Sequence, residues 1–485
     1  MTKYIKLAIM LMLTAAIITA CGNGDDPDTA DNAPPNTDPI NLTILAPDIY
    51  TNLIRSVEQD MRQQFAEQGI NFRIELTDYS LANFERYQHN DTLQVMLMAG
   101  EGYDIVFLNS TPMNIRSFAE NGFLLNIYDL IDQDPNLTRD DFFTNVFAAM
   151  EHQGGLYTFP FTFGFDFVGI NANLPDAFLN EFSQKSQISL FEIMNLLNRL
   201  ESEYPEVYDS FHYNSNIQAL LFHTMALTHV ASDFIDFDNA TSLFNTAEFV
   251  NLMNAIQNTV PINTRQNFSS DENLFFAFDT VADMNRMAED NIFLGIFRRP
   301  MSFTNLTPFF PAADEQFLNF IPIADNNGKL QINTESHVNT HTFGRVIFPV
   351  VGDGVVAWDF TQQLLNRMLT STSFTLTRGQ FGSSVFVIPI LRNELEPHFD
   401  RVMRAVENDD REFHFGTQAE IAANSAAALA RITELANRPV SVIDSSPTSF
   451  FWDGDLYNSF MIGATTAENL AQEVHNRASL WLLGG

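Results

Sequence analysis

Residues 40–79 read INLTILAPDIYTNLIRSVEQDMRQQFAEQGINFRIELTDY, and this stretch decides the predicted fold. Residues 40–47 are apolar and β-branched and end in proline, which is typical of a buried strand. Residues 51–68 carry apolar side chains three and four positions apart, which predicts an amphipathic helix stopped by Gly69. The apolar face of this helix consists of Ile54, Val57, Met61 and Phe65. Residues 70–77 alternate apolar and polar side chains, so a half-buried strand follows the helix.

The next residues continue this alternation. A polar-rich helix is predicted over about 81–98, and a Gly-Glu-Gly turn leads into a buried strand at 103–108. Strands and helices that alternate with short connections favour an α/β lobe with a mostly parallel sheet. Ligands of such open sheets bind beyond the carboxyl ends of the strands. Those ends lie here at residues 47–50, 77–79 and 109–111.

Later segments have the same character. Further helices and short apolar strands are predicted at 246–257, 293–297, 317–323 and 354–370. The last helix is expected to start with a capping box formed by Thr465 and Glu468. One face of that helix collects Leu470, Val474, Ala478 and Trp481. The body is therefore expected to contain α/β structure from end to end.

The N-terminal residues predict where the protein is located. Two lysines precede the uncharged apolar residues 7–20, which indicates a signal peptide over residues 1–20. The sequence ITACG at 18–22 resembles the bacterial lipobox, in which the cysteine becomes lipidated, and Cys21 is the one cysteine of the chain. An ordinary signal peptide with an incidental cysteine is the alternative. Residues 22–39 are rich in Asp and Pro and predict a disordered tether to the folded body.

Composition excludes several classes of partner and site. The 485 residues include 25 Lys+Arg and 60 Asp+Glu, and the net charge of −35 repels nucleic acid and anionic head groups. We therefore expect no nucleic-acid partner and a membrane contact through the lipid anchor only. A single cysteine excludes an intramolecular disulfide and a cysteine zinc site. His337 and His341 lack the glutamate of an HExxH motif, so no metal site and no cofactor are expected.

Several segments, in order, resemble the family 1 extracellular solute-binding proteins, which are lipid-anchored, maltose-binding-protein-like receptors of ABC importers. LQVMLMAGEGYDIVFL (93–108) is similar to the family's helix, small-residue turn and buried strand, with Asp104 at its acidic position. GGLYTFPFTFGFDFVGINANLP (154–175) resembles the crossing from the first lobe to the second. The other similar segments are 121–131, 234–253, 318–330 with 343–365, and 456–482.

The resemblance implies a periplasmic-binding-protein-like type II fold, with two α/β lobes, a hinge and a ligand cleft between the lobes. After the signal peptide and the lipidated tether, 21–39, the implied lobes are 40–162 plus 343–393 and 163–342 plus 394–485. Closure of the lobes around a solute would be the function, and the ABC permease would recognise the closed form. The resemblance also implies a monomer outside the cytoplasm, anchored to the cell membrane by Cys21.

Candidate ligand residues follow from the chemistry of sugars, whose apolar faces and hydroxyl edges need aromatic platforms and polar partners. Trp452 matches a family position whose tryptophan stacks on sugar, and a packed seam between helices is the alternative. The ends of the first and third strands add Asp48, Tyr50, Asn109, Ser110 and Thr111. Asp453, Phe163, Arg298 and Arg299 are further candidates, with a solvated turn, the core and surface ion pairs as their alternatives.

A carbohydrate is the expected ligand, and two alternatives remain. The adjacent Arg298 and Arg299 and the abundant Phe fit a peptide or another small solute about as well as a sugar. A lipid-anchored glycoside hydrolase would use paired carboxylates, which 60 acidic residues supply by chance. The chain has no GxSxG or HExxH motif and no nucleophilic cysteine, so we expect a binding protein and no enzyme.

Overall fold

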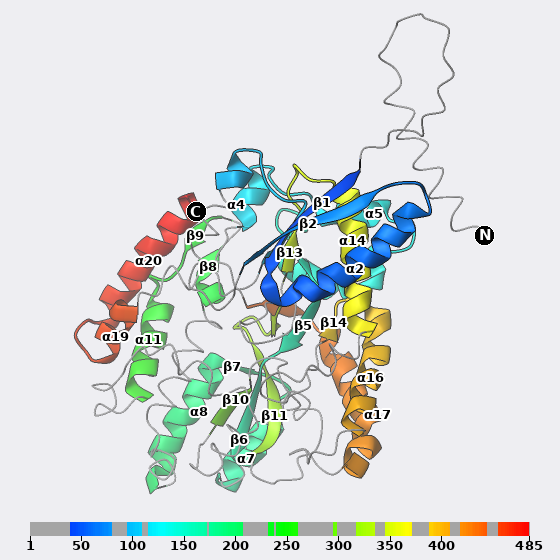
Figure 1. The fold of residues 1–485 in the computed structure, drawn as a ribbon. Coiled ribbons are helices and arrows are strands. Elements are labelled where there is room, and N and C mark those ends of the chain that lie inside the picture. The colour runs from blue at the N-terminus through cyan, green and yellow to red at the C-terminus, as the bar shows by residue number, and fades with distance from the viewer. Residues whose placement is uncertain are drawn as a thin grey trace, which may run out of the picture. The chain divides into compact units, whose positions relative to one another are not determined.

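The computed structural model describes most of the chain after residue 38, and residues 40–485 form one compact unit. Two large sheets, here called the first and second sheet, are the framework for the surrounding helices (Figure 1). The described residues are 39–79, 95–108, 115–171, 174–206, 231–236, 239–259, 294–297, 317–334, 345–370, 388–407, 418–443 and 454–484.

The first sheet has five strands in the order β2-β1-β3-β13-β4. Strand β1 pairs in parallel with β2 along its full length and with β3 on its other side. Strand β13 is antiparallel to both β3 and β4. The three predicted strands are therefore confirmed as a parallel group, and the rest of the sheet is antiparallel. The bounds are β1 Ile40–Pro47, β2 Phe72–Tyr79, β3 Ile105–Leu108, β4 Phe159–Pro160 and β13 Arg345–Ile347.

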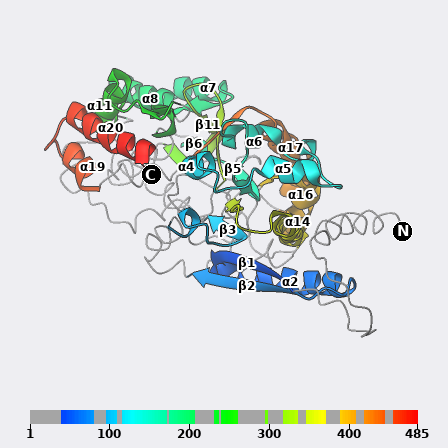
Figure 2. The same cartoon turned by 90° about the horizontal axis from the view of Figure 1, so that it is seen from above.

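Helix α2 (Thr51–Ala66) lies along this sheet beside β2 (Figure 2). Its predicted apolar face is confirmed, because the inward side chains are Ile54, Val57, Met61 and Phe65. A buried carboxylate on the same helix, Glu58, accepts the backbone N–H of Ile74 in β2 at 2.9 Å. Apolar packing and one buried polar contact together fix the helix against the strand.

The second sheet has the path β10-β6-β11-β12-β5-β14, with β7 beside β11 and β15 beside β12. Its described pairs are antiparallel except β7 with β11 and β12 with β15. The bounds are β5 Thr162–Phe165, β6 Phe167–Asn171, β7 Ile188–Ser189, β10 Leu294–Phe297, β11 Phe317–Ala324, β12 Leu330–Asn333, β14 Ile388–Pro389 and β15 Val440–Val442. A separate antiparallel pair consists of β8 (Ile235–Asp236) and β9 (Thr241–Ser242).

Two large hydrophobic cores divide the helices. The second core holds side chains of β6 and β11 and of the helices α7 (Asp176–Ser183), α8 (Leu190–Glu203), α11 (Ala247–Thr259), α19 (Gly454–Met461) and α20 (Ala467–Gly484). The first core holds the first sheet with the helices α2, α5 (Ile127–Gln133), α6 (Thr144–Met150), α14 (Gly354–Thr370), α16 (Leu395–Glu407) and α17 (Gln418–Ala436). Side chains of β5, β12, β14 and β15 also belong to the first core, so that core extends under both sheets.

A smaller third core covers the other face of the first sheet. It joins Leu45, Val106 and Ile347 of the sheet to Phe118 of α4 (Ile115–Glu120). The parallel strands of the first sheet are therefore buried on both faces, as is usual for such strands.

Most predicted elements are confirmed, including the helices at 246–257 and 354–370, which appear as α11 and α14. The strands predicted at 293–297 and 317–323 are β10 and β11. Of the helix predicted at about 81–98, the described part, 95–98, is helical. Trp358 of α14 is buried, as expected, and its indole N–H donates to Asp134 at 2.8 Å.

The expected capping box of the last helix is wrong by one residue. Helix α20 begins at Ala467, and the hydroxyl of Thr466 accepts the backbone N–H of Asn469 at 3.3 Å. The backbone N–H of Thr465 instead donates to the carbonyl of Ser459, which belongs to the turn that ends α19. The chain is still completing the preceding helix at Thr465, so the following threonine caps the next one.

Asp104 joins three parts of the first sheet. Its buried carboxylate accepts the backbone N–H and the hydroxyl of Thr43 in β1, each at 2.6 Å, and the backbone N–H of Asp353 at 2.6 Å. Gly352 allows this approach, because a Cβ at that position would lie 2.6 Å from the Cα of Asp104. The carboxylate therefore links β1, the start of β3 and the loop before α14.

We expect Asp104→Asn to lower the free energy of unfolding by about 2 kcal/mol, because an amide oxygen cannot replace both carboxylate oxygens as acceptors. Urea unfolding followed by circular dichroism measures the change. The matched control is Asp140→Asn at an exposed acid in the 3-10 helix Arg139–Asp141. Equal midpoints for the two variants would contradict the proposed linking role.

Asp233 is an acid whose protonated form the fold favours. It lies in the 3-10 helix Ala231–Phe234, and burial, followed by the charge of the buried Asp325 and then of Glu248, raises the pKa of Asp233 to about 7. The backbone N–H of Asn326 opposes this shift by donating a hydrogen bond. Because the folded protein holds the proton more tightly than the unfolded chain, stability falls as the pH rises through this window.

Asp233→Asn should therefore remove a pH-dependent loss of stability. Between pH 4 and pH 7 the melting temperature of the unmodified protein should fall relative to that of the variant, since only the carboxyl group ionises there. Calorimetry across this range, with Asp140→Asn as the control, measures the difference. A constant gap between variant and unmodified protein from pH 4 to pH 7 would refute the raised pKa.

Candidate functional site

The carboxyl edge of the first sheet is the candidate site. The three parallel strands β2, β1 and β3 end together there, at Tyr79, Pro47 and Leu108. The antiparallel strand β13 begins at the same edge, because Arg345 pairs with Leu108 and with Pro160 at the end of β4. Five segments therefore bring their ends to one line, where ligands of open α/β sheets bind.

Asp48 and Tyr50 follow β1 in the short 3-10 helix Asp48–Tyr50 and have different surroundings. The side chain of Asp48 is exposed at the edge. Tyr50 is buried, and its ring centroid lies 5.5 Å from that of Phe107 in β3. Of these two sequence candidates, only Asp48 has a side chain that is accessible to a solute.

Asp78 adds a second exposed carboxylate, near the end of β2. One of its oxygens accepts from the hydroxyl of Thr51 at 3.5 Å, so the end of β2 meets the start of α2. The sequence predicts a strand end at residues 77–79, but Asp78 and Thr51 are not among the candidate ligand residues. The position of Asp78 near the end of a predicted parallel strand could have identified it, because ligands contact the carboxyl ends of such strands.

Arg345 brings a cation to the same edge. It is the first residue of β13 and is 9% exposed. Basic residues are scarce in this chain, with 25 Lys+Arg among 485 residues, so a buried guanidinium at a strand end is notable. Sequence reasoning missed it because β13 is only three residues long, and its pairing with β3 depends on residues far apart in the chain.

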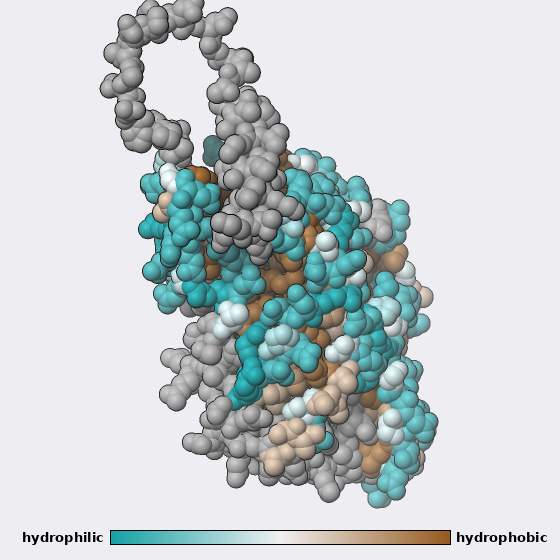
Figure 3. All heavy atoms as spheres, turned by 90° about the vertical axis from the view of Figure 1, so that its right-hand side faces the viewer, coloured by the Kyte–Doolittle hydropathy of each residue, from teal (hydrophilic) through white to brown (hydrophobic). Residues whose placement is uncertain are grey.

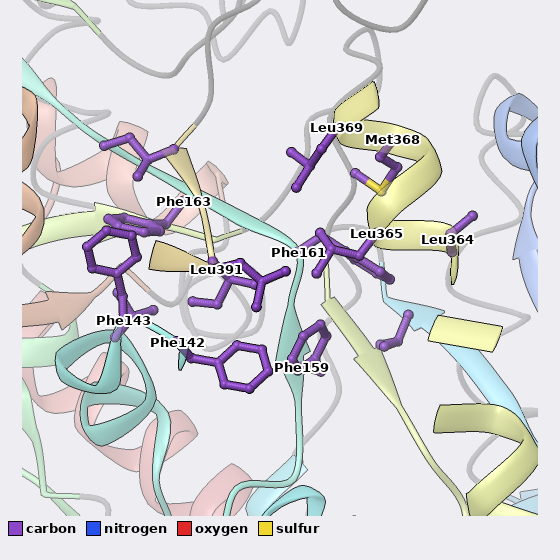
Figure 4. Packing of buried hydrophobic residues seen from close by; sticks show 14 of the residues in the cluster. Phe142, Phe143, Phe159, Phe161, Phe163, Leu364, Leu365, Met368, Leu369 and Leu391 are labelled. Carbon is purple, nitrogen blue, oxygen red and sulfur yellow. The ribbon is translucent and has the colours of Figure 1, made fainter. Parts of the chain in front are cut away.

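The phenylalanines of the crossing segment lie in the first core. Phe163 is buried, and its ring centroid lies 5.3 Å from that of Phe143 (Figure 4). Phe161 stacks at 6.1 Å on Phe107, and Phe165 lies 6.0 Å from Phe163. The position of Phe163 fits the core alternative, and its ring packs the crossing segment against Phe143 in the first core.

The crossing segment connects the two sheets with almost no intervening loop. Strand β4 belongs to the first sheet, and β5 begins in the second sheet after the single residue Phe161. A second connection runs from β12 in the second sheet to β13 in the first, through residues 334–344. A third connection runs from β13 through α14 to β14 in the second sheet. Arg345 lies at the end of the second connection, so the candidate edge adjoins the first two of these three links.

The remaining sequence candidates lie outside the described residues. Asn109, Ser110 and Thr111 come directly after β3, and Arg298 and Arg299 come directly after β10. Trp452 and Asp453 directly precede α19. The lipidation candidate Cys21 and the pair His337 and His341 are also outside this part of the chain.

Charge and apolarity of the described residues limit the chemistry further. Within the ranges described above, no three His, Cys, Asp or Glu side chains gather closely enough to hold a metal ion. In the same ranges, no helix has the length and apolarity needed to cross a bilayer. Hydrophilic residues cover much of the face shown in Figure 3, with hydrophobic residues visible between them. Among the described residues, the edge offers the carboxylates of Asp48 and Asp78, the hydroxyl of Thr51 and the guanidinium of Arg345.

Comparison with known proteins identifies the fold. No family model matches the chain, and no curated protein matches it. The sugar-binding protein MalE from Xanthomonas citri is 12% identical, with a TM-score of 0.52 over 91% of this chain and 97% of its own. An extracellular solute-binding protein of family 1 from Alicyclobacillus acidocaldarius is 13% identical, with a TM-score of 0.48 over 92% of this chain and 100% of its own. The likeness to the Xanthomonas protein shows that this chain has the type II periplasmic-binding-protein fold, an α/β fold of two lobes.

Proposed function

We propose that the chain is the solute-binding lipoprotein of an ABC importer and that it captures a carbohydrate by closing its two lobes. The observation that carries the proposal is the likeness of fold to a sugar-binding protein over 91% of the chain. The proposed lobes are 40–162 plus 343–393 and 163–342 plus 394–485. The chemistry of the candidate edge and the sequence of the N-terminus support the proposal independently.

The candidate edge offers the groups that a sugar needs. Exposed carboxylates such as Asp48 and Asp78 accept hydrogen bonds from sugar hydroxyls, and charged acceptors make the stronger bonds. The guanidinium of Arg345 can donate to hydroxyl or ring oxygens from the same edge. Trp452 is the proposed aromatic platform for the apolar face of a sugar ring. Asn109, Ser110, Thr111, Arg298, Arg299 and Asp453 remain proposed polar contacts.

The links between the sheets suit a protein that closes on its ligand. The connection between β4 and β5 is the single residue Phe161, and the side chains of both strands are buried. A change in the angle between the lobes therefore has to concentrate in a few backbone dihedrals. Hinges of this kind absorb a change in backbone dihedrals at a few positions between rigid bodies. A solute that contacts both lobes stabilises the closed state by its differential affinity for that state. The ABC permease would then receive the closed, loaded form.

A binding protein is favoured over a hydrolase. The neighbours of this fold are binding proteins, and their likeness supports a role without catalysis. A retaining or inverting hydrolase requires two carboxyl groups at a set separation across one sugar bond. The proposed activity is therefore capture and delivery outside the cytoplasm, from a lipid anchor at Cys21.

A thermal-shift screen tests the ligand class. A maltooligosaccharide present at 100 times its dissociation constant should add about 2.7 kcal/mol to the free energy of unfolding. Peptides and organic acids form the comparison sets, and new reducing ends are assayed in the same samples. A shift with a peptide alone would replace the carbohydrate and keep the binding role, whereas new reducing ends would point to the hydrolase.

The same screen locates the site when it is repeated on variants. Asp48→Asn should weaken carbohydrate binding about tenfold, since a hydrogen bond to a charged acceptor contributes roughly 1.5 kcal/mol. Asp140→Asn, at an exposed acid of another element, should bind as the unmodified protein does. Unchanged affinity in Asp48→Asn would move the site away from this edge.

The lipid anchor predicts a second outcome. Cys21→Ser should prevent acylation, because the chain has no other thiol, and the protein should appear in the medium or periplasm instead of the membrane fraction. Incorporation of an alkyne-labelled fatty acid, detected on a gel, measures the modification directly. Labelling that persists in Cys21→Ser would show that the lipid is attached elsewhere.

A further inference from the structure

A group of exposed aliphatic side chains lies at the amino edge of the first sheet, opposite the candidate site. Val350 and Val351 follow β13 and are 48% and 50% exposed, and Val355 in the first turn of α14 is 60% exposed. Met98 is 68% exposed in the short helical segment that precedes β3. We call Met98, Val350, Val351 and Val355 the valine patch. Large apolar side chains exposed together mark an interaction surface more often than scattered single ones do.

Two observations place the loop that carries Val350 and Val351 beside the helical segment that carries Met98. A Cβ built on Gly102 would lie 3.5 Å from Leu97 Cδ2 and 3.7 Å from Val351 Cγ2, so Gly102 separates the helical segment from the loop. The backbone N–H of Asp353 donates to Asp104 at 2.6 Å, which holds that loop against the start of β3. Val350 and Val351 therefore lie on a loop that this hydrogen bond holds in place.

The proposed tether enters the folded body at this same edge. Strand β1 begins at Ile40, and its fourth residue, Thr43, donates to Asp104 at 2.6 Å. Asp104 in turn accepts from Asp353 within the loop of the valine patch. The end of the tether is thus about three residues of extended strand from the patch, on the order of 10 Å. A lipid at Cys21 would hold this edge toward the bilayer.

We propose that the valine patch contacts the surface of the bilayer in which Cys21 is anchored, and so sets the orientation of the protein on the membrane. This inference rests on the lipid anchor in the proposed function. A second copy of the chain is a poorer occupant of the patch, because each copy carries a net charge of −35 and the two copies would repel each other.

The charge of the protein selects the kind of lipid. Glu101 and Asp353 are exposed beside the patch, and the whole chain is acidic, so anionic head groups repel it. Repulsion between exposed charges is screened beyond about 8 Å at physiological ionic strength, whereas apolar contact acts only at the surface. Zwitterionic phosphatidylcholine is therefore the bilayer surface that fits the patch best.

The test uses the full lipidated protein in phosphatidylcholine vesicles, with and without brominated acyl chains, which quench nearby fluorophores. An environment-sensitive fluorophore is attached at Val355→Cys, and lipid on Cys21 leaves that new thiol as the one site for labelling. The matched control is Leu480→Cys on α20, an apolar position that is 71% exposed and lies outside the patch. Brominated lipid should quench the fluorophore at residue 355 at least twofold more than the one at residue 480.

The outcomes separate this inference from the proposed function. If the proteins float with the vesicles but bromination quenches residues 355 and 480 equally, the inference is wrong and the proposed lipid anchor is supported. If the protein does not float with the vesicles, both the proposed lipid anchor and this inference are wrong. The fluorescence at residue 355 could instead change with the amount of protein per vesicle and not with bromination. That result would indicate that a second copy of the chain covers the patch, and it would overturn the inference. Selective quenching that weakens when phosphatidylglycerol is added, and recovers in high salt, supports the proposal.

Discussion

Both sheets depend on one nearly continuous run of backbone, residues 159–171. Strand β4 completes the first sheet by pairing with β13, and β5 and β6 lie in the second sheet after breaks of one residue each. The phenylalanines along this run are buried, and three pairs of their rings meet edge to face: Phe159 with Phe161, Phe163 with Phe165, and Phe165 with Phe167. Neither sheet can shift its register here without disturbing the packing of the other, which couples the two lobes mechanically.

The abundance of phenylalanine has a structural cause in this region. Aromatic rings bury large areas and favour tilted or edge-to-face pairs, and the first core repeats that geometry around Phe142, Phe147 and Phe159. Rings that fill a core cannot serve as platforms for a ligand. The aromatic content of the sequence therefore reflects, in this region, the packing of the core.

The parallel half of the first sheet could be predicted because each of its strands carries a local periodicity and is followed by a turn or a helix. The helix α2 was predictable for the same reason, down to its buried side chains. The antiparallel half could not be, since β13 has three residues and pairs with β3 across more than two hundred positions. Arg345 was missed along with its strand. The cap at Thr466 was missed because the backbone N–H of Thr465 bonds to the carbonyl of Ser459 in the preceding helix α19. The local sequence pattern does not reveal this hydrogen bond.

The late position of β13 in the chain has a consequence for folding. Synthesis from the N-terminus delivers β1, β2 and β3 first, and the edge of β3 has no strand beside it until residues 345–347 emerge. An unpaired edge is a site for wrong pairing with other chains, and long-range pairings form slowly. The order of synthesis thus leaves an intermediate that is prone to aggregate until β13 pairs with β3.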